Sequence, residues 1–491
     1  MRRTMPKSRA GIWILAATLA AVLTALLGAC AVNPVTGKTQ ISLISPAQEI
    51  EIGREGYGPV TREYGLYDDV ELRTYVNAVG QKLARVSHLP DLEWHFTVLD
   101  DPTVNAFAMP GGYIYITRGI LVHLNSEAQL AGVLAHEIGH VTRRHSASQL
   151  TQQQLYGAGV ALGSIISPTF QRYSGVAQTA LGLLFLKYSR SDETQADELA
   201  VEYATKAGYD PREIPAVYAM IKRISDQSGQ RLPGFLATHP DPGDRERITG
   251  ELATQAVVGK GTLAINRDGH FAQADGVLFG PDPRQGYFDG DHYYHPNLGF
   301  QIAFPAGWKH FDSHSSVAAE EPNQAAVMQL SSAEGAGDLS PTAYVASLKT
   351  NGAIRSSNGA TEAIGGFAAW VGHMTVGAEG QTPTILDAAF VRKGSNLFQF
   401  LGRSASPGDV HEGRIFTAIR SFRGLTDAAR INVTPDRVQL KTVSTAGTFD
   451  AVARNLGAAA ADVETDAIMN QVLATDRIAA GTRLKIVARL H

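Results

Sequence analysis

The chain has 491 residues and 44% of them are hydrophobic, which is enough material for two or three hydrophobic cores. Its formal net charge is only −4 and no basic block follows the N-terminal region, so nucleic acid is excluded as an expected partner. A single cysteine rules out an internal disulfide, and stability must therefore come from packing.

The N-terminal region predicts export. Four basic residues precede an apolar run at 11–29, as in a secretory signal peptide. The run ends Leu-Gly-Ala-Cys, which resembles a bacterial lipobox and implies cleavage before Cys30 and a lipid on its thiol. Such a lipid would hold the chain on a membrane, and Ala31 in place of aspartate implies the outer rather than the inner membrane. A transmembrane anchor and an ordinary signal peptide are the alternatives.

The next segments predict a short tether and the first elements of a mostly helical domain. Residues 30–44 are predicted to be a polar tether. A helix should begin after Ser45, which is followed by a proline and then, three positions on, by a glutamine, the pattern of a capping box. A second helix is expected around 69–87, and the apolar alternation of residues 94–98 predicts a strand.

The most informative motif is His-Glu-Ile-Gly-His at 136–140. A capped start at Ser126 and an apolar stripe at helical spacing predict that the motif lies on a helix. On a helix, His136 and His140 share one face and can ligate one metal ion, while Glu137 lies beside them as a general base. The alternative is a helix with two incidental histidines.

Two histidines do not complete a catalytic zinc site, which needs a third protein ligand. A third histidine in the extended motif would follow a glycine, but Arg143 and Ser146 occupy those two positions. His145 should turn away from the shared face and lie at the surface. A second helix is predicted after Ser189, and it presents Glu193 and Asp197 four residues apart. These two acids could also be an ordinary acidic helix start.

The two motifs together, HEIGH and SRSDETQAD, resemble the zinc metallopeptidase family of the CaaX prenyl endoproteases and HtpX, in particular its periplasmic lipoprotein-type members. The resemblance implies a gluzincin-type site with one zinc ion per chain. By this resemblance Glu193 is the third metal ligand beside His136 and His140. Asp197 is then a second-shell acceptor that orients one of the zinc histidines.

Two further segments gain a role from the same resemblance. Metallopeptidases of this type pair an edge strand beside the zinc with the substrate backbone. The residues expected to form that strand are Tyr113, Ile114, Tyr115 and Ile116. The segment Thr-His-Pro-Asp-Pro-Gly-Asp-Arg resembles the family's His-Pro segment, so His239 is expected to gate the open zinc position or to stabilise the oxyanion, and Arg245 to anchor the loop. A plain buried strand and a surface turn are the alternatives.

The fold expected from these elements is multidomain α+β. Residues 45–256 form a mostly helical, gluzincin-type peptidase domain with a small edge-strand sheet. Within it, residues 156–186 are expected to be core helices or a lid over the site. Residues 257–286 are rich in Gly, Pro and Asp and are predicted to be a linker.

Two smaller modules are expected after the linker. Residues 287–425 should form a mixed α/β module with strands around 325–331, 367–376 and 387–402, and its opening Phe-x-Ile-x-Phe-Pro-x-Gly-Trp resembles PsbP-like or Mog1-like domains. Residues 434–491 read strand, helix, helix, strand, which resembles a degenerate LysM module. That resemblance implies peptidoglycan as a partner.

Three functions compete at this point. The first is a zinc metalloendopeptidase that cleaves unfolded or misassembled cell-envelope proteins in protein quality control, a substrate class implied only by the family's periplasmic members. The second is a non-catalytic periplasmic chaperone or assembly factor. The third is a peptidoglycan-associated hydrolase.

Overall fold

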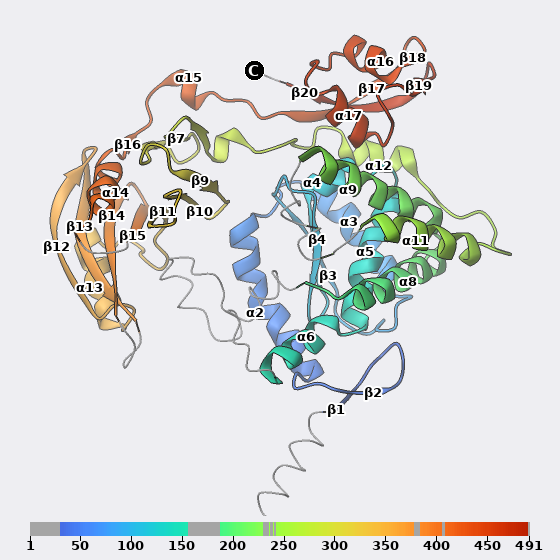
Figure 1. Ribbon diagram of the computed structural model, residues 1–491, viewed down its shortest axis with the longest axis horizontal. Coiled ribbons are helices and arrows are strands. Elements are labelled where there is room, and N and C mark those ends of the chain that lie inside the picture. The colour runs from blue at the N-terminus through green and yellow to red at the C-terminus, as the bar shows by residue number, and fades with distance from the viewer. Residues whose placement is uncertain are drawn as a thin grey trace, which may run out of the picture.

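Figure 1 shows the computed structural model, which describes residues 30–155, 187–228, 235, 239, 242–377, 383–404 and 408–489. A helical part in blue to green lies beside a β-rich part in yellow to orange, and a small red C-terminal module lies above the helical part. This confirms the expected multidomain α+β organisation with a helical N-terminal region. The predicted signal peptide at 1–29 and the predicted core helices or lid at 156–186 lie outside the described residues.

The helical part holds most of the helices of the chain. They are α2 (Pro46–Tyr64), α3 (Val70–Ala84), α4 (Arg118–His123), α5 (Glu127–Thr142), α6 (His145–Leu155), α8 (Arg190–Lys206), α9 (Ile214–Ser228), α11 (Pro242–Ala256) and α12 (Arg267–Ala274). Its strands are β1 (Cys30–Val32), β2 (Thr39–Ile41), β3 (His95–Leu99), β4 (Ala106–Met109) and β5 (Tyr113–Thr117). None of the helices in the described ranges combines the length and the hydropathy that crossing a bilayer requires.

The predicted helix starts are largely correct. Ser45 Oγ accepts from the Gln48 N–H at 3.3 Å, and the Gln48 side chain accepts from the Ser45 N–H at 2.8 Å, which completes the capping box of α2. Ser126 caps α5 by accepting from the Gln129 N–H at 3.1 Å. The Gln129 side chain, however, accepts from the Asn125 N–H, one residue earlier than a capping box requires.

The three-stranded sheet has the order β3-β5-β4, with β3 parallel and β4 antiparallel to the central β5. The prediction that Tyr113–Ile116 form an edge strand is therefore wrong. Gly111 and Gly112, both at positive φ, turn the chain from β4 into β5, and the earlier strand β3 then pairs with the other side of β5. In the described sheet β4 is an edge strand, and it is the strand that packs most closely on α5.

Helix α5 lies in the centre of the helical core. All of its residues after Glu127 are buried, among apolar side chains from α3, α8, α9 and the sheet. Gly139 allows α8 to approach closely, because a Cβ at this position would lie 3.2 Å from both Cα and O of Ala196. The small side chain of Ala196 and the absence of a side chain at Gly139 thus allow the close contact between α5 and α8.

The second half of the predicted linker at 257–286 is packed into the helical core, although residues 257–268 are mostly exposed. Helix α12 buries Phe271 completely, and the His270 ring bonds to the backbone carbonyl of Leu121. Val277 and Leu278 join the same core cluster. These few apolar residues are separated by turns, so the sequence, rich in Gly, Pro and Asp, did not indicate that they are buried.

The β-rich part contains two antiparallel sheets. The larger has the order β12-β13-β14-β15-β11-β10-β9 and the smaller β16-β8-β7-β6. Their strands are β6 (Tyr287–Asp289), β7 (His292–His295), β8 (Phe300–Ala303), β9 (Lys309–Asp312), β10 (Ser316–Glu320), β11 (Ala326–Ser332), β12 (Ser356–Ile364), β13 (Phe367–Val376), β14 (Thr384–Lys393), β15 (Asn396–Ser404) and β16 (Arg423–Gly424). The single strand expected at 387–402 is thus parts of two strands, β14 and β15.

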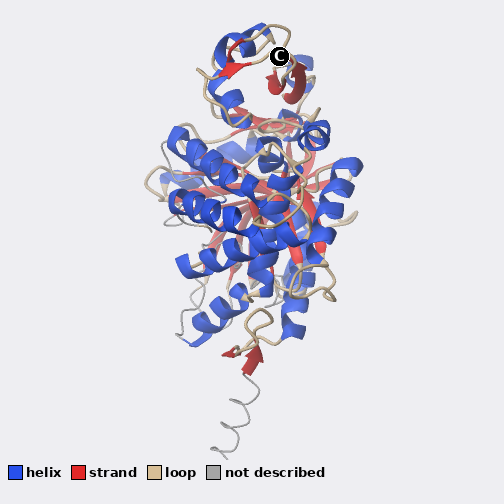
Figure 2. Ribbon diagram, turned by 90° about the vertical axis from the view of Figure 1, so that its right-hand side faces the viewer, coloured by secondary structure: helices blue, strands red, loops and turns tan. Residues whose placement is uncertain are grey.

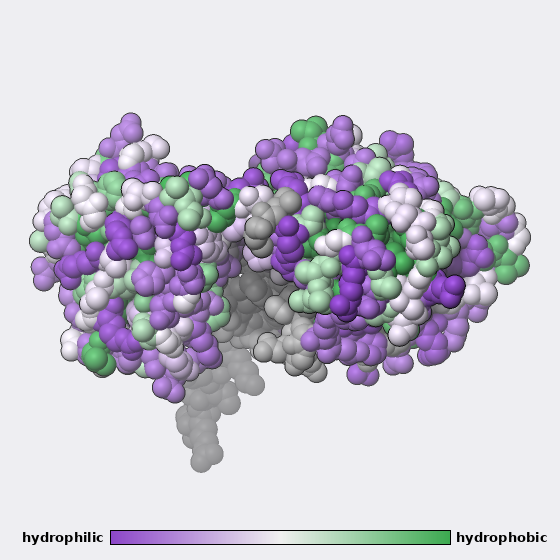
Figure 3. Space-filling model, turned by 90° about the horizontal axis from the view of Figure 1, so that it is seen from above, coloured by the Kyte–Doolittle hydropathy of each residue, from purple (hydrophilic) through white to green (hydrophobic). Residues whose placement is uncertain are grey.

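Two helices cover opposite faces of the larger sheet. Helix α13 (Pro341–Thr350) packs on one face through a cluster that includes Tyr344 and Phe390. Helix α14 (Val410–Arg420) packs on the other face through Ile415 and Ile419. Seen from above in Figure 3, the β-rich part forms one lobe, and the helical part with the C-terminal module over it forms the other; the visible faces of both are mainly polar.

The C-terminal module has the predicted order of strand, helix, helix and strand. Its elements are β17 (Arg437–Thr442), β18 (Gly447–Thr448), α16 (Phe449–Asn455), α17 (Val463–Met469), β19 (Arg477–Ile478) and β20 (Arg483–Ala488), and β17 pairs antiparallel with β20. Figure 2 shows this module stacked on the helical part. The contacts that join them include two from the module to α4: buried Lys485 donates to the carbonyls of Val122 and Leu124 at 2.5 and 2.6 Å, and Gln471 donates to that of His123.

Candidate metal centre

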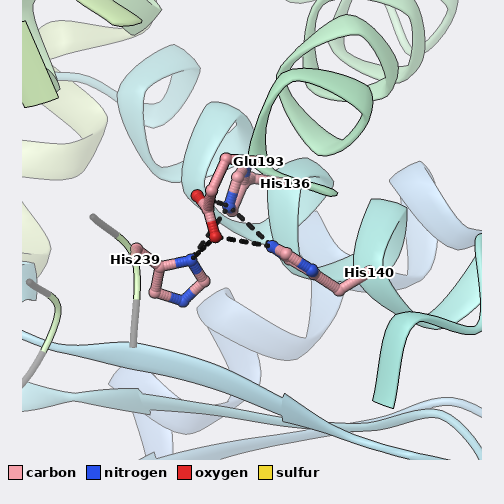
Figure 4. A group of neighbouring side chains, drawn as sticks. All are labelled: His136, His140, Glu193 and His239. Carbon is pink, nitrogen blue, oxygen red and sulfur yellow. Dashed lines mark hydrogen bonds and ion pairs between the residues drawn. The ribbon is translucent and has the colours of Figure 1, made fainter. Parts of the chain in front are cut away.

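Helices α5 and α8 bring the three predicted metal ligands together. The Nε2 atoms of His136 and His140, one helical turn apart, lie 3.0 Å from each other. Glu193, in the first turn of α8, places its carboxylate oxygens 3.6 Å from His136 Nε2 and 3.7 Å from His140 Nε2. All three side chains are buried, and Figure 4 shows them converging on one point.

His239 is a fourth donor at the same point. Its Nδ1 lies 2.8 Å from Glu193 Oε1 and 3.4 Å from His136 Nε2, and the residue is fully buried. Its ring stacks on Phe235 with centroids 4.5 Å apart. Ligand atoms about 2.0–2.2 Å from a tetrahedral zinc ion lie about 3.3 Å from one another, so the contacts around His239 and the other donors fit such an ion.

Arg245 and Asp197 contact the donor residues and hold them in position. Asp197 Oδ1 lies 3.1 Å from His136 Nδ1, on the side of the ring opposite the donor nitrogen. The Arg245 guanidinium contacts Asp197 Oδ2 at 2.8 Å, Glu193 Oε2 at 2.6 Å and the Tyr218 hydroxyl at 2.7 Å. Arg245 therefore fixes both carboxylates of α8 from its position in α11.

Glu137 has the surroundings expected of a general base beside a metal ion. It is fully buried, yet neither of its carboxylate oxygens has a hydrogen-bond partner among the described residues. Its nearest charged neighbour is His239, whose Nε2 lies 3.7 Å from Glu137 Oε1. Burial raises the pKa of Glu137, partly opposed by His239 and His136, which suits a general base. Buried carboxylate oxygens are normally satisfied, so these mark a place for a ligand.

The charges at the centre suit a cation. Burial lowers the pKa of His140 well below its usual range, and the nearby His136 lowers it further. Burial alone would raise the pKa of Glu193, but His239 and Arg245 outweigh it and leave the pKa below the usual value. Burial likewise opposes ionisation of Asp197, and Arg245 holds its pKa far below the usual range. Neutral imidazole and ionised carboxylate are the forms that bind metal.

The prediction that His145 lies at the surface is wrong. It is only 4% exposed, and its Nδ1 lies 2.9 Å from His140 Nδ1. The prediction assumed a continuous helix, but α5 ends at Thr142 and Arg144 adopts a positive φ of 60°, which folds the next residue back toward the centre. Burial lowers the pKa of His145 to about 4, so the ring is neutral at physiological pH.

Tyr188 is a site residue that the sequence reasoning missed. Its ring stacks on His140 with centroids 3.9 Å apart, and its hydroxyl lies 3.0 Å from Ser146 Oγ. Its position next to the cap of α8, Ser189, was the available signal. The other predicted site residues lie elsewhere: Tyr113–Ile116 are in the sheet centre, and Cys30 begins β1, where its lipidation stays a prediction.

Two histidines one helical turn apart, a glutamate beside the first and a carboxylate from a neighbouring helix define a zinc metallopeptidase centre of the HExxH type with glutamate as third donor. Residues 71–250 match the model of Peptidase family M48. The chain belongs to this family, whose members are zinc-dependent, and the donor set is compatible with that ion.

Named relatives agree with this assignment. The chain is 31% identical over 234 residues to the mitochondrial metalloendopeptidase OMA1 of Schizosaccharomyces pombe, a match that covers 47% of this chain and 68% of that protein. It is 29% identical over 256 residues to the beta-barrel assembly-enhancing protease of Escherichia coli (strain K12), which covers 50% of this chain and 52% of that protein. The chain thus spans about half the length of this bacterial relative.

A solved structure also matches part of the chain. The solution structure of cyanobacterial PsbP from Synechocystis sp. PCC 6803 aligns with a TM-score of 0.22 and 16% identity, over 27% of this chain and 91% of that one. A TM-score this low supports no conclusion, so the likeness of residues 287–425 to PsbP stays a prediction.

Proposed function

We propose that this chain is a zinc metalloendopeptidase that hydrolyses peptide bonds of unfolded or misassembled cell-envelope proteins. The observation that carries the proposal is the buried carboxylate of Glu137. It has no hydrogen-bond partner among the described residues, and it lies beside the converging donors of His136, His140 and Glu193. The substrate class is supported by the name of the bacterial relative, the beta-barrel assembly-enhancing protease. The family assignment itself does not depend on that substrate.

The residues have distinct roles in this proposal. His136, His140 and Glu193 hold zinc, which supplies a Lewis acid for the scissile carbonyl and lowers the pKa of a water molecule to about 7. Glu137 accepts the proton of the attacking water and returns it to the leaving amine. Asp197 orients His136, and Arg245 keeps Asp197 and Glu193 ionised and in position.

His239 sets the state of the centre. Its Nδ1 lies 2.8 Å from Glu193 Oε1, so it would take the fourth position that a catalytic zinc site leaves for water or substrate. We therefore assign His239 to gating rather than to the oxyanion: we propose that this arrangement is latent and that His239 must withdraw before substrate binds.

The substrate backbone is proposed to add to the outer edge of β4. The Thr117 N–H bonds to the Asn105 carbonyl, so the alternation of an antiparallel ladder directs the N–H and C=O of Ala108 away from β5. An Ala108→Pro variant would remove an outward donor and spare the ladder. We expect it to keep zinc and lose cleavage of extended peptides, and unchanged cleavage would refute the use of this edge.

The location and the C-terminal module complete the proposal. Export and a lipid on Cys30 would place the centre at the periplasmic face of the envelope, on the outer membrane, and peptidoglycan remains a proposed ligand of residues 434–491. Palmitate labelling that persists in a Cys30→Ser variant would exclude the lipid anchor.

The decisive experiment compares the full-length wild type with Glu137→Gln. The variant keeps the shape of the side chain, so we expect one zinc ion at the centre in both proteins and loss of casein cleavage in the variant by at least 100-fold. A Glu71→Gln variant at an exposed position of α3 is the control. Unchanged cleavage in Glu137→Gln would overturn the role of Glu137 and favour a contaminating activity or a non-catalytic chaperone.

A further inference from the structure

A second group of metal-ligand side chains lies in the β-rich part, away from the centre described above. His373 on β13 is the direct cross-strand partner of Asp387 on β14. His373 lies two residues from Val371, and Asp387 lies two residues from Ala389, so each pair shares one face of the sheet. Val371 and Ala389 belong to the cluster beneath α14, and His373 and Asp387 therefore lie on the face that this helix covers. Glu412, in the first turn of α14, reaches the same place. Three separate elements thus deliver one imidazole and two carboxylates.

Two distances in this group match those between ligands of one metal ion. His373 Nε2 lies 3.4 Å from Asp387 Oδ1 and 3.2 Å from Glu412 Oε1, and one donor atom from each residue falls within 4.8 Å of the others. Ligands about 2.0–2.2 Å from a tetrahedral zinc ion are separated by about 3.3 Å. The single imidazole nitrogen is therefore placed at a ligand-to-ligand distance from both carboxylates.

The charges of the group are unbalanced without a cation. Asp387 is only 4% exposed, and its Oδ2 has no hydrogen-bond partner in the described part of the chain. In those ranges the ion pairs of Asp387 and Glu412 are with His373 alone, and no lysine or arginine pairs with either carboxylate. Burial, followed by the proximity of Glu412, raises the pKa of Asp387 to about 6. One imidazole shared between two carboxylates offsets their charge incompletely, and a bound cation would complete that compensation.

We propose that His373, Asp387 and Glu412 form a second binding site, specific for a divalent transition metal such as Zn²⁺. An imidazole ligand favours such ions over Mg²⁺ and Ca²⁺, which prefer oxygen alone. The His373 side chain is 37% exposed, so the ion has access from solvent and keeps at least one position for water. Bound there, the ion ties the first turn of α14 to strands β13 and β14, and its role is structural.

The number of zinc ions per chain tests this site in the full-length protein. After removal of metal with a chelator, equilibration with Zn²⁺ and desalting, we expect two zinc ions in the wild type and one in His373→Ala and in Glu412→Gln. Those two variants should still cleave casein, because the peptidase centre is intact. His292→Ala, an exposed histidine on β7, is the matched control and should keep two ions.

A protein without the histidines of the peptidase centre allows zinc binding at the second site to be measured alone. In a His136→Ala, His140→Ala protein, Zn²⁺ should still bind at one ion per chain and raise the melting temperature, and adding His373→Ala should abolish both effects. One zinc ion in the wild type that disappears with His136 and His140 would overturn the second site and leave the peptidase centre unaffected. Two ions that persist in both His373→Ala and Glu412→Gln would overturn it as well.

Discussion

The Nδ1 atoms of His140 and His145 lie 2.9 Å apart in the interior, so one ring must donate to the other. If His140 binds the metal through Nε2, its Nδ1 carries the proton and His145 is the acceptor. Partners of this kind fix the tautomer and orientation of metal-binding histidines. His145 thus orients His140 in the same way as Asp197 orients His136.

Removal of this acceptor should weaken zinc binding. For His145→Ala we expect a loss of zinc affinity of about 10–100-fold, the range typical of such partners. Competition with a chromophoric chelator measures it, with the exposed His292→Ala as control. An affinity equal to that of the wild type would show that the contact does not orient His140.

The glycine of the metal motif should resist substitution although it lies in a helix. In a free helix Gly139→Ala would gain about 1 kcal/mol of helix propensity. Here the new Cβ would lie 3.2 Å from the backbone of Ala196 and push α8, which carries Glu193, away from α5. We therefore expect lower zinc retention after dialysis.

Gly250→Ala is the matched control for that substitution. Gly250 lies inside α11, where an added Cβ meets only Pro215 Cγ at an ordinary 3.7 Å. This variant should melt at the same or a higher temperature and keep its zinc. Full zinc retention in Gly139→Ala would mean that α8 accommodates the methyl group without moving Glu193.

The gating role of His239 predicts a gain of activity. In His239→Ala the other three donors remain, so zinc should stay bound while the fourth position becomes free, and cleavage of casein should rise several-fold. Initial rates normalised to zinc content measure the effect. A fall in rate at unchanged zinc content would instead assign His239 to stabilisation of the oxyanion.

The C-terminal module should lose stability as the pH rises. Asp466 is fully buried, with one oxygen accepting from the Val487 N–H at 3.0 Å and the other without a partner, and burial raises the pKa of its carboxyl to about 7. An unfolded aspartate titrates near 3.9. Between these values the folded chain binds more protons than the unfolded one, so the free energy of unfolding falls from about pH 4 to about pH 7 and then levels off.

An Asp466→Asn variant isolates this effect from other titrations. It stays uncharged, so its melting temperature should fall less than that of the wild type between pH 5 and pH 7.5. The difference corresponds to a free energy on the order of a few kcal/mol. The exposed Asp450→Asn in the same module should follow the wild type, and parallel curves for all three proteins would contradict the prediction.

Local patterns in the sequence were sufficient for part of this structure. The face shared by His136 and His140 and the cap of α2 depend on residues within one or two turns, and both were correct. His239 could be connected with the centre only through the resemblance to a family, because it lies 103 residues from His136 along the chain.

Errors arose where distant chain segments decide the outcome. The central position of β5 depends on its pairing with β3, which no property of Tyr113–Ile116 encodes. The error over His145 has a local cause instead, because the burial of His145 depends on the left-handed conformation of the preceding residue, Arg144. The group around His373 is invisible in sequence because its three members come from two strands and a helix.

The contacts of Lys485 and Gln471 with the helical part also affect the order in which the protein folds during its synthesis. These side chains bond to the end of α4 and to Gln129 at the start of α5, from which they are separated by 342 to 363 residues. Contacts between such distant segments form late in folding. The helix that carries the metal motif therefore obtains these supports only after residues 471–485 have been synthesised, long after the motif itself.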